Sequence, residues 1–297
     1  MILVFGSINI DVLMPVPHLP TPGETVLGGD YALAPGGKGA NQALAARRAG
    51  ANVTIAGAVG EDGFAAAALE LLQRDGVDLG LVHRVSRPTG CAAVIVGGEG
   101  ENAIAVAPGA NATVRAADVP DATLGTNTIL VCQLEVPAAE TAALIRRARG
   151  HGARIVLNLA PALPLKPDLL AEIDVLVANQ GEAATLGDPE AIARQLRKAL
   201  VVTMGAAGAT AYFADGARIA VPALAIEPID TTGAGDAFVG VLAAGLDQGL
   251  TIGAALHRAS AAAGIACLTR GAQPALPDRA AIDASAARLP ELQRIPS

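Results

Sequence analysis

The sequence predicts an α/β protein in which a mainly parallel sheet lies between two layers of helices, with a small β-rich lid beside it. Short β-branched runs alternate with Ala- and Leu-rich stretches of helical periodicity, which is typical of a parallel sheet covered on both faces. Two regions rich in Pro and Gly break this rhythm. Neither an internal repeat nor a polar linker divides the 297 residues, so a single domain over residues 1–297 is expected.

The elements follow in order along the chain. Strands are expected at short apolar runs, namely Ile2–Phe5, Val53–Ala58, Ile129–Cys132, Arg154–Leu157, Val175–Ala178 and Leu200–Thr203. Helices are expected at Asn41–Ala49, Phe64–Arg74, Ala138–Arg149, about 234–248 and 251–267, and a hairpin at Ala209–Phe213 and Arg218–Val221. The lid is expected at about 12–36 and 84–108, where Cys91–Val96 and Ala103–Ala107 alternate; a pair of surface hairpins is the alternative.

Composition narrows the classes of function. The net charge is −7 and the longest basic cluster is Arg146, Arg147 and Arg149, so nucleic-acid binding is not expected. The three cysteines are far apart and lack metal-ligand spacing, which favours reduced thiols and a cytoplasmic protein. The N-terminus has no basic segment and the apolar runs are short, so neither a signal peptide nor a membrane helix is expected.

The most informative segment is Asp230–Phe238, which joins a β-like stretch to a helix through Gly233 and Gly235. Glycines allow close approach of the backbone to a ligand, and free N–H groups at a helix start attract phosphate oxygens. Asp236 falls in the first helical turn, where its carboxylate suits a general base; the alternative is that it only complements the helix dipole. A Rossmann fingerprint fails because Phe238 replaces the third glycine.

A second glycine-rich loop, Pro35–Ala43, leads into a helix. Lys38 is followed by Gly39 and not by Ser or Thr, which excludes a Walker A loop. Donors at the helix start and the amide of Asn41 suit a polyhydroxylated sugar, whereas the alternative is a flexible turn with a capping Asn.

Polar groups also follow several of the predicted strands, where open α/β sheets bind ligands. These groups are Asn9 and Asp11, Glu135, Asn158, Asn179 and Glu182, and the glycine-rich run Thr203–Gly208. Their recurrence favours one shared ligand crevice over independent loops.

Taken together, these motifs resemble the PfkB-type carbohydrate kinases and, among them, the ribokinase group. The resemblance covers nearly the whole chain and rests on Gly6–Asp11, Gly36–Asn41, Gly98–Asn102, Gln133–Glu135, Asn179 with Glu182, Asp230–Asp236 and Gly271–Pro274. It implies a ribokinase-like fold and Asp236 as the base. It further implies a sugar site made of Asn9, Asp11, Gly37, Lys38, Gly39, Ala40, Asn41, Glu135 and Asp236.

The resemblance also implies the rest of the site. The main-chain N–H groups of Gly233, Ala234 and Gly235 would form an anion hole for the transferred phosphoryl group, and Glu182 would help to place Mg²⁺, through water. ATP would lie along Asn179, Thr203, Met204, Gly205, Ala206, Ala207, Gly208, Gly235, Asp236 and Ser260. An activating K⁺ would be held by Asp230, Thr232, Ala266, Thr269, Gly271 and Ala275.

Two positions depart from the family pattern. Ala275 stands where the family often has Ser, which removes one K⁺ ligand, and Ser260 replaces a larger polar residue near the adenine. The expected activity is ATP-dependent phosphorylation of D-ribose at its 5-hydroxyl. The alternatives are a kinase for another small sugar or a nucleoside, and a sugar-binding regulator without catalysis. Exposed strand edges tend to pair with other strands, so a homodimer joined through the lids is expected. The family resemblance implies the same.

Overall fold

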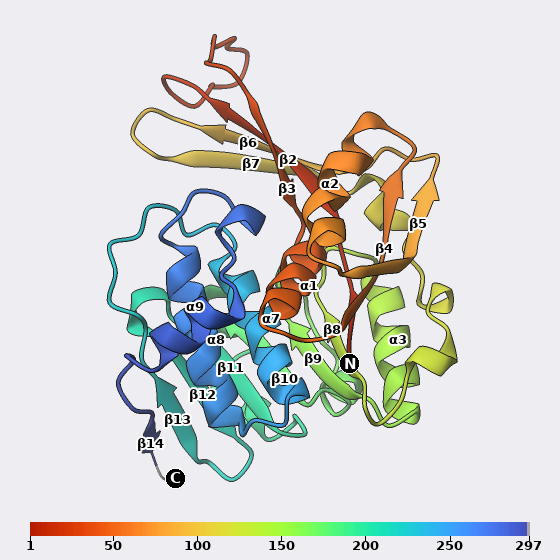
Figure 1. Cartoon of the computed structure of the whole chain (residues 1–297), viewed down its shortest axis with the longest axis vertical. Helices are drawn as coiled ribbons and strands as arrows, with labels where there is room; N and C mark the ends of the chain where they lie inside the picture. The colour runs from red at the N-terminus through yellow and green to blue at the C-terminus, as the bar shows by residue number, and fades with distance from the viewer. Residues whose placement is uncertain (296–297) are drawn as a thin grey trace.

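The computed structural model describes residues 1–295 and contains a sheet of ten strands and a separate sheet of four (Figure 1). The order in the large sheet is β14-β13-β12-β11-β10-β9-β8-β1-β4-β5. The seven strands from β11 to β5 are parallel to one another, and β12, β13 and β14 continue the sheet antiparallel. In chain order the ten strands are β1 (Ile2–Phe5), β4 (Val53–Gly60), β5 (Asp78–Val85), β8 (Ile129–Cys132), β9 (Arg154–Asn158), β10 (Val175–Asn179), β11 (Ala199–Thr203), β12 (Ala209–Phe213), β13 (Arg218–Val221) and β14 (Gln293–Ile295).

Helices cover both faces of this sheet. Successive side chains of a strand point to opposite faces, and in β1 Ile2 and Val4 join one buried apolar cluster whereas Leu3 and Phe5 join the other. The first cluster includes α1 (Lys38–Arg48), α2 (Gly63–Arg74), α7 (Ala234–Asp247), α8 (Ile252–Ala266) and α9 (Arg279–Ala286). The second includes α3 (Ala138–Gly150), α4 (Pro167–Leu170), α5 (Gln180–Ala184) and α6 (Pro189–Ala193).

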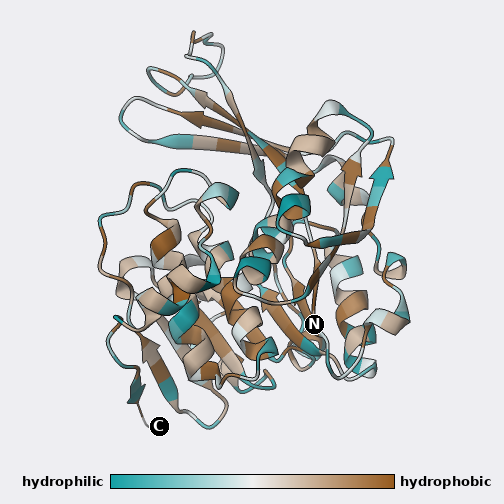
Figure 2. Ribbon diagram, viewed as in Figure 1, coloured by the Kyte–Doolittle hydropathy of each residue, from teal (hydrophilic) through white to brown (hydrophobic). Residues whose placement is uncertain are grey.

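The colouring by hydropathy follows this layering, because the central strands are brown over most of their length (Figure 2). Close packing of small residues brings α1 and α7 together: a Cβ on Gly240 of α7 would lie 2.5 Å from the carbonyl oxygen of Gln42 in α1. The two helices that carry the conspicuous sequence motifs therefore lie against each other.

The four-stranded sheet projects from the core as a lid (Figure 1). Its order is β3-β2-β6-β7, with β2 parallel to β6 and the outer pairs antiparallel. The strands are β2 (Asn9–Pro15), β3 (Ala32–Gly36), β6 (Gly90–Val96) and β7 (Asn102–Ala107). The separate small sheet agrees with the lid reading and not with a pair of surface hairpins.

The predicted three-layer core is confirmed, and most predicted elements begin or end within a few residues of the observed ones. Two details differ. Residues 84–85, assigned above to the lid, belong to the edge strand β5 of the large sheet, and Asn9 and Asp11 lie inside lid strand β2 and not in the loop directly after β1. Within residues 1–295, no helix has both the length and the apolar character needed to cross a membrane.

Candidate active site

Asp236 lies in the first turn of α7, as the sequence predicts. Gly233 caps this helix with φ 77°, a left-handed conformation that glycine adopts without strain. Among residues 1–295, the N–H group of Gly235 has no hydrogen-bond partner, because the first donors of a helix lack an acceptor within it. The Ala234 N–H donates to Thr231 O over 3.2 Å, so within the described residues the carboxylate lies beside the free N–H groups of Gly233 and Gly235.

Two side-chain amides from α1 hold the Asp236 carboxylate. Asn41 Nδ2 donates to Oδ2 over 2.9 Å and Gln42 Nε2 donates to Oδ1 over 2.9 Å. Burial raises the pKa of Asp236, while Lys38 and these two donors pull it back down. The other atom of the Asn41 amide, Oδ1, is buried and has no partner in residues 1–295, so it is free to accept a hydrogen bond from a ligand.

One lysine lies among several carboxylates at this point. Asp236 and Glu135 raise the pKa of Lys38 against the effect of burial. Burial together with Glu135 and Asp236 raises the pKa of Asp11 to about 6, so Asp11 is mainly ionised at neutral pH. No hydrogen bond within residues 1–295 occupies the Asp11 carboxylate, which leaves both oxygens open to hydroxyl donors.

Glycines bring the walls of this polar site close together. Glu135 Oε2 accepts from Lys38 N over 3.1 Å and from Ser7 Oγ over 2.5 Å, which ties the start of α1 to the end of β8. A Cβ at Gly36 would lie 2.4 Å from an Asp11 oxygen, and one at Gly39 2.6 Å from the carbonyl carbon of Gly6. Glycine at these positions is therefore a packing requirement of the site.

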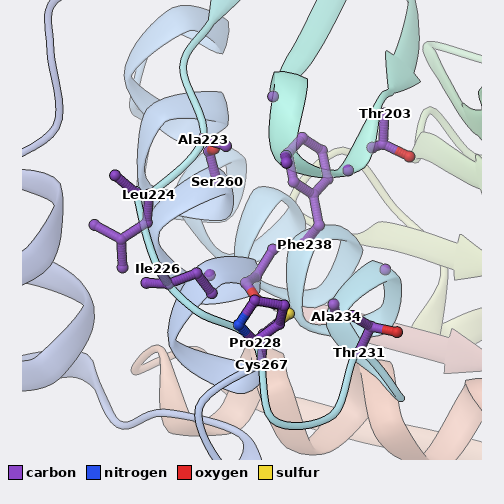
Figure 3. Close-up of a pocket in the computed structure, with 17 residues that line it drawn as sticks. Thr203, Ala223, Leu224, Ile226, Pro228, Thr231, Ala234, Phe238, Ser260 and Cys267 are labelled. Atoms are coloured by element: carbon purple, nitrogen blue, oxygen red, sulfur yellow. The ribbon is translucent and has the colours of Figure 1, made fainter. Parts of the chain in front are cut away.

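An apolar cavity of about 350 Å³ opens on the other side of the α7 N-terminus (Figure 3). The loop after β13 supplies Leu224, Ile226 and Pro228, and the helices supply Phe238 and Ser260. The Ser260 hydroxyl is already used, because it donates to Pro222 O over 2.5 Å. Besides Ser260, the cavity is lined by five of the predicted nucleotide residues, namely Thr203, Gly205, Ala206, Gly208 and Gly235.

Not every predicted nucleotide residue lines this cavity. Its lining residues do not include Asn179, Met204, Ala207 and Asp236. Asn179 caps α5 by accepting from Glu182 N over 2.8 Å, and Glu182 Oε2 accepts in turn from Asn179 N over 2.8 Å. The other Glu182 oxygen has no partner in the described chain, and Glu182 is close enough to Lys38 to raise its pKa.

The segments predicted to hold K⁺ are adjacent. Asp230 accepts from Thr232 N over 2.9 Å and from Gly271 N over 2.8 Å. Partial burial opposes ionisation of Asp230, but these hydrogen bonds keep its pKa below the ordinary value. Ala266 ends α8, Thr269 is exposed and Ala275 is buried without a side-chain ligand. No group of three or more acidic, histidine or cysteine side chains able to hold a metal is found in residues 1–295.

Four residues of the site carry no assigned role in the sequence analysis. They are Ser7, Gln42, Gln133 and Asn111, of which Asn111 donates to Asn9 Oδ1 over 2.7 Å and so fixes the Asn9 amide. The adjacent amides of Asn41 and Gln42, so early in a buried helix, are the only signal that could have indicated Gln42. Ser7 has no partner base near it in the sequence, but the fold supplies Glu135 from 128 residues away.

Fold and site together are those of a phosphotransferase that acts on an alcohol group. The chain belongs to the PfkB family: residues 1–279 match the pfkB family of carbohydrate kinases. This result agrees with the resemblance drawn from the motifs.

Relatives of this family cover almost the whole chain. A ribokinase of Bacillus subtilis is 36% identical over 94% of this chain and 96% of its own length, and one of Schizosaccharomyces pombe is 34% identical over 96% and 97%. A deoxyribokinase of Salmonella typhi is 32% identical over 93% and 95%. The solved structure of Thermotoga maritima ribokinase superposes with a TM-score of 0.89 at 30% identity, covering 96% of this chain and 98% of that one. Arabidopsis thaliana ribokinase, solved with ribose and ATP, gives 0.86 at 28% identity and covers 96% and 98%.

Proposed function

We propose that this carbohydrate kinase transfers the γ-phosphate of ATP to the 5-hydroxyl of D-ribose, giving D-ribose 5-phosphate. The observation that carries the proposal is the placement of Asp236, a buried carboxylate next to the free N–H groups of Gly233 and Gly235 at a helix start and to an open polar site. Ribokinase relatives over the full length and the Arabidopsis complex with ribose and ATP support the choice of sugar and nucleotide.

In this proposal the sugar hydroxyls bind at the open groups of the polar site. The Asp11 carboxylate accepts from hydroxyls, Asn41 Oδ1 accepts from another, and Asn9 Nδ2, which has no partner in residues 1–295, donates. Main-chain atoms of Gly37, Gly39 and Ala40 and the side chains of Lys38 and Glu135 complete the sugar site.

Asp236 acts on the hydroxyl that reacts. Its carboxylate removes the proton as the oxygen–phosphorus bond forms, and the N–H groups of Gly233, Ala234 and Gly235 stabilise the charge on the phosphoryl group. Positioning and electrostatics supply most of the rate in such transfers.

The adenine of ATP is assigned to the apolar cavity of Figure 3, and the phosphates to the side of Thr203–Gly208 and Gly235. Asn179 borders the nucleotide site at the end of β10. A single open carboxylate oxygen at Glu182 fits a Mg²⁺ that is bound mainly by water and by the nucleotide, whose charge it neutralises. Carbonyl groups of the adjacent segments 230–232 and 266–275, with the ionised Asp230, suit K⁺ even though Ala275 offers no hydroxyl.

A coupled ADP-release assay across D-ribose, 2-deoxyribose, fructose and adenosine tests the assignment. D-ribose should give the highest kcat/KM, and phosphorus NMR should place the product phosphate on the 5-oxygen. Deoxyribose is the closest rival because one full-length relative is a deoxyribokinase. A higher kcat/KM for any other sugar would reassign the substrate, and sugar binding by calorimetry without turnover would favour the regulator.

The lid suggests a homodimer. Its strand β7 is exposed along its whole length, and apolar side chains such as Tyr31 (65% exposed), Ile104 (59%) and Val106 (53%) are open to solvent. A second copy that covers this sheet would remove both the edge and the apolar surface from water. Light scattering at micromolar concentration should therefore give the mass of a dimer, and Ile104→Asp should shift it toward the monomer; a monomeric parent protein would contradict the proposal.

A further inference from the structure

Behind Asp236 lies a row of buried side-chain amides, none of which takes part in the proposed mechanism. Gln42 and Gln133 are 0% exposed and Asn158 is 8% exposed. Gln133 Nε2 donates to Gln42 Oε1 over 2.6 Å, and Gln42 Nε2 donates both to Asn158 Oδ1 over 3.0 Å and to Asp236 Oδ1 over 2.9 Å. Two strand ends and two helices thus meet at the Gln42 amide.

The donor and acceptor ends of these amides are fixed by Asn158. Asn158 Nδ2 donates to the main-chain carbonyl of Val177 over 3.2 Å, and a carbonyl can only accept. Asn158 must therefore turn Oδ1 toward Gln42, and Gln42 must turn Nε2 toward Asn158. The same NH₂ group then points its second hydrogen at Asp236, while Gln42 Oε1 accepts from Gln133.

Tight packing leaves little room for another arrangement. A Cβ at Gly6 would lie 2.0 Å from Gln133 Oε1, so glycine at the end of β1 makes space for the Gln133 amide. Gln42 donates both of its N–H groups and accepts one hydrogen bond at Oε1, whereas Gln133 Oε1 is buried and has no partner in residues 1–295. Because both Gln42 donors are used and its oxygen accepts from Gln133, the orientation of the Gln42 amide is specified.

We propose that Gln42 is a positioning residue for the reaction: oriented by Asn158 and Gln133, its amide keeps the Asp236 carboxylate ionised and turned toward the acceptor hydroxyl. The inference rests on the proposed role of Asp236 as the base. Burial works against the charge on Asp236, and the nearby charged groups are Lys38, Glu135 and Asp11, of which only Lys38 favours ionisation. Hydrogen-bond donors held in a fixed position are therefore needed to offset the effect of burial on the Asp236 carboxylate.

Gln42→Glu tests this role with almost no change of shape. The new carboxyl oxygen would face the oxygens of Asp236 and Asn158, and the two carboxyl groups would share a proton. The acid limb of the kcat/KM profile should move to higher pH, and kcat at pH 7 should fall by about 10²-fold, the lower end of the contribution of a general base. Gln42→Met, which removes the donor without adding a charge, should move the limb in the same direction by less.

Gln248→Glu is the matched control. Gln248 caps the opposite end of α7 and donates to Ala49 O over 3.0 Å, so it joins the same two helices far from the site. This variant should leave the pH profile unchanged. An acid limb that stays in place in both Gln42 variants would overturn the proposal.

A direct titration separates this inference from the assignment of the base. Carbon NMR of protein labelled at the Asp carboxyl carbon, with the Asp236 signal identified by its loss in Asp236→Asn, should show a higher pKa for Asp236 in Gln42→Met than in the parent. A pKa that does not change refutes the inference even where the enzyme turns over ribose. An enzyme inactive on every sugar, with the NMR shift present, would instead refute the proposed function.

Discussion

Asp236→Asn should lose turnover of D-ribose while it retains the sugar. The amide cannot take the proton of the attacking hydroxyl, and removal of a general base lowers the rate by about 10²–10⁴-fold. Sugar affinity should change little, because Asp11, Asn9 and Asn41 supply the other hydrogen bonds. Initial rates with saturating ATP measure the first effect, and calorimetric titration with ribose measures the second.

The substitution also has a structural cost that must be separated from the chemical one. Asn41 and Gln42 each donate to one Asp236 oxygen, and an Asn at 236 offers a single acceptor, so one buried donor loses its partner. Such a loss costs about 1–3 kcal/mol of stability. Thermal melts with and without ribose will show whether the variant is folded under assay conditions.

Asp174→Asn provides the comparison. Asp174 is also a buried carboxylate (6% exposed), but it directly precedes β10, at the amino-terminal ends of the parallel strands. There it accepts from Ile155 N over 2.7 Å and pairs with Arg149. This variant should lose stability and keep its kcat. If Asp236→Asn retained kcat within about tenfold of the parent, well short of the loss of a general base, Asp236 would not be the base.

The sequence predicted the parts of the fold whose signals are local. Runs such as Ile129–Cys132 are buried on both faces of a parallel sheet and are apolar at every position, so their pattern is unambiguous. The edge strand β5 is partly exposed, and its mixed sequence Asp78–Val85 gave no such pattern. β14 has only three exposed residues and pairs with a strand more than 70 residues earlier in the chain, which no local pattern reveals.

The candidate site divides in the same way. Glycines directly before a helix, as at Gly233–Asp236, can be recognised in the local sequence. The structure has Asp236 in the helical turn where the motif predicts it. Hydrogen-bond partners that come from distant segments have no such local sequence pattern. Gln42 reads as one more polar residue in an Ala-rich helix until the fold brings it to Asp236, 194 residues later in the chain. The apolar loop after β13 likewise forms a wall of the cavity only together with residues of α7 and α8.

Gly233→Ala should disable the proposed anion hole without touching the base. The residue has φ 77°, and a Cβ there would lie 2.9 Å from the Cα and Cβ atoms of Ala272, closer than unbonded carbons approach. Either the start of α7 or the segment around Ala272 must move, and the N–H groups of residues 233–235 move with it. Loss of one such donor lowers kcat by about 10²–10³-fold, so a decrease of that order is expected.

Gly249→Ala is the control that separates the effect of backbone strain from the effect on the anion hole. Gly249 follows the other end of α7 with φ 80°, and a Cβ there would meet no atom within 4 Å. Both substitutions carry the left-handed strain of about 1–2 kcal/mol, but only Gly233→Ala adds a clash beside the site. Because the strain is shared, melting temperatures should fall in both variants while kcat falls in Gly233→Ala alone. Equal kcat values in the two variants would mean that phosphoryl stabilisation does not depend on where the α7 N-terminus lies, and the anion hole would have to be sought elsewhere.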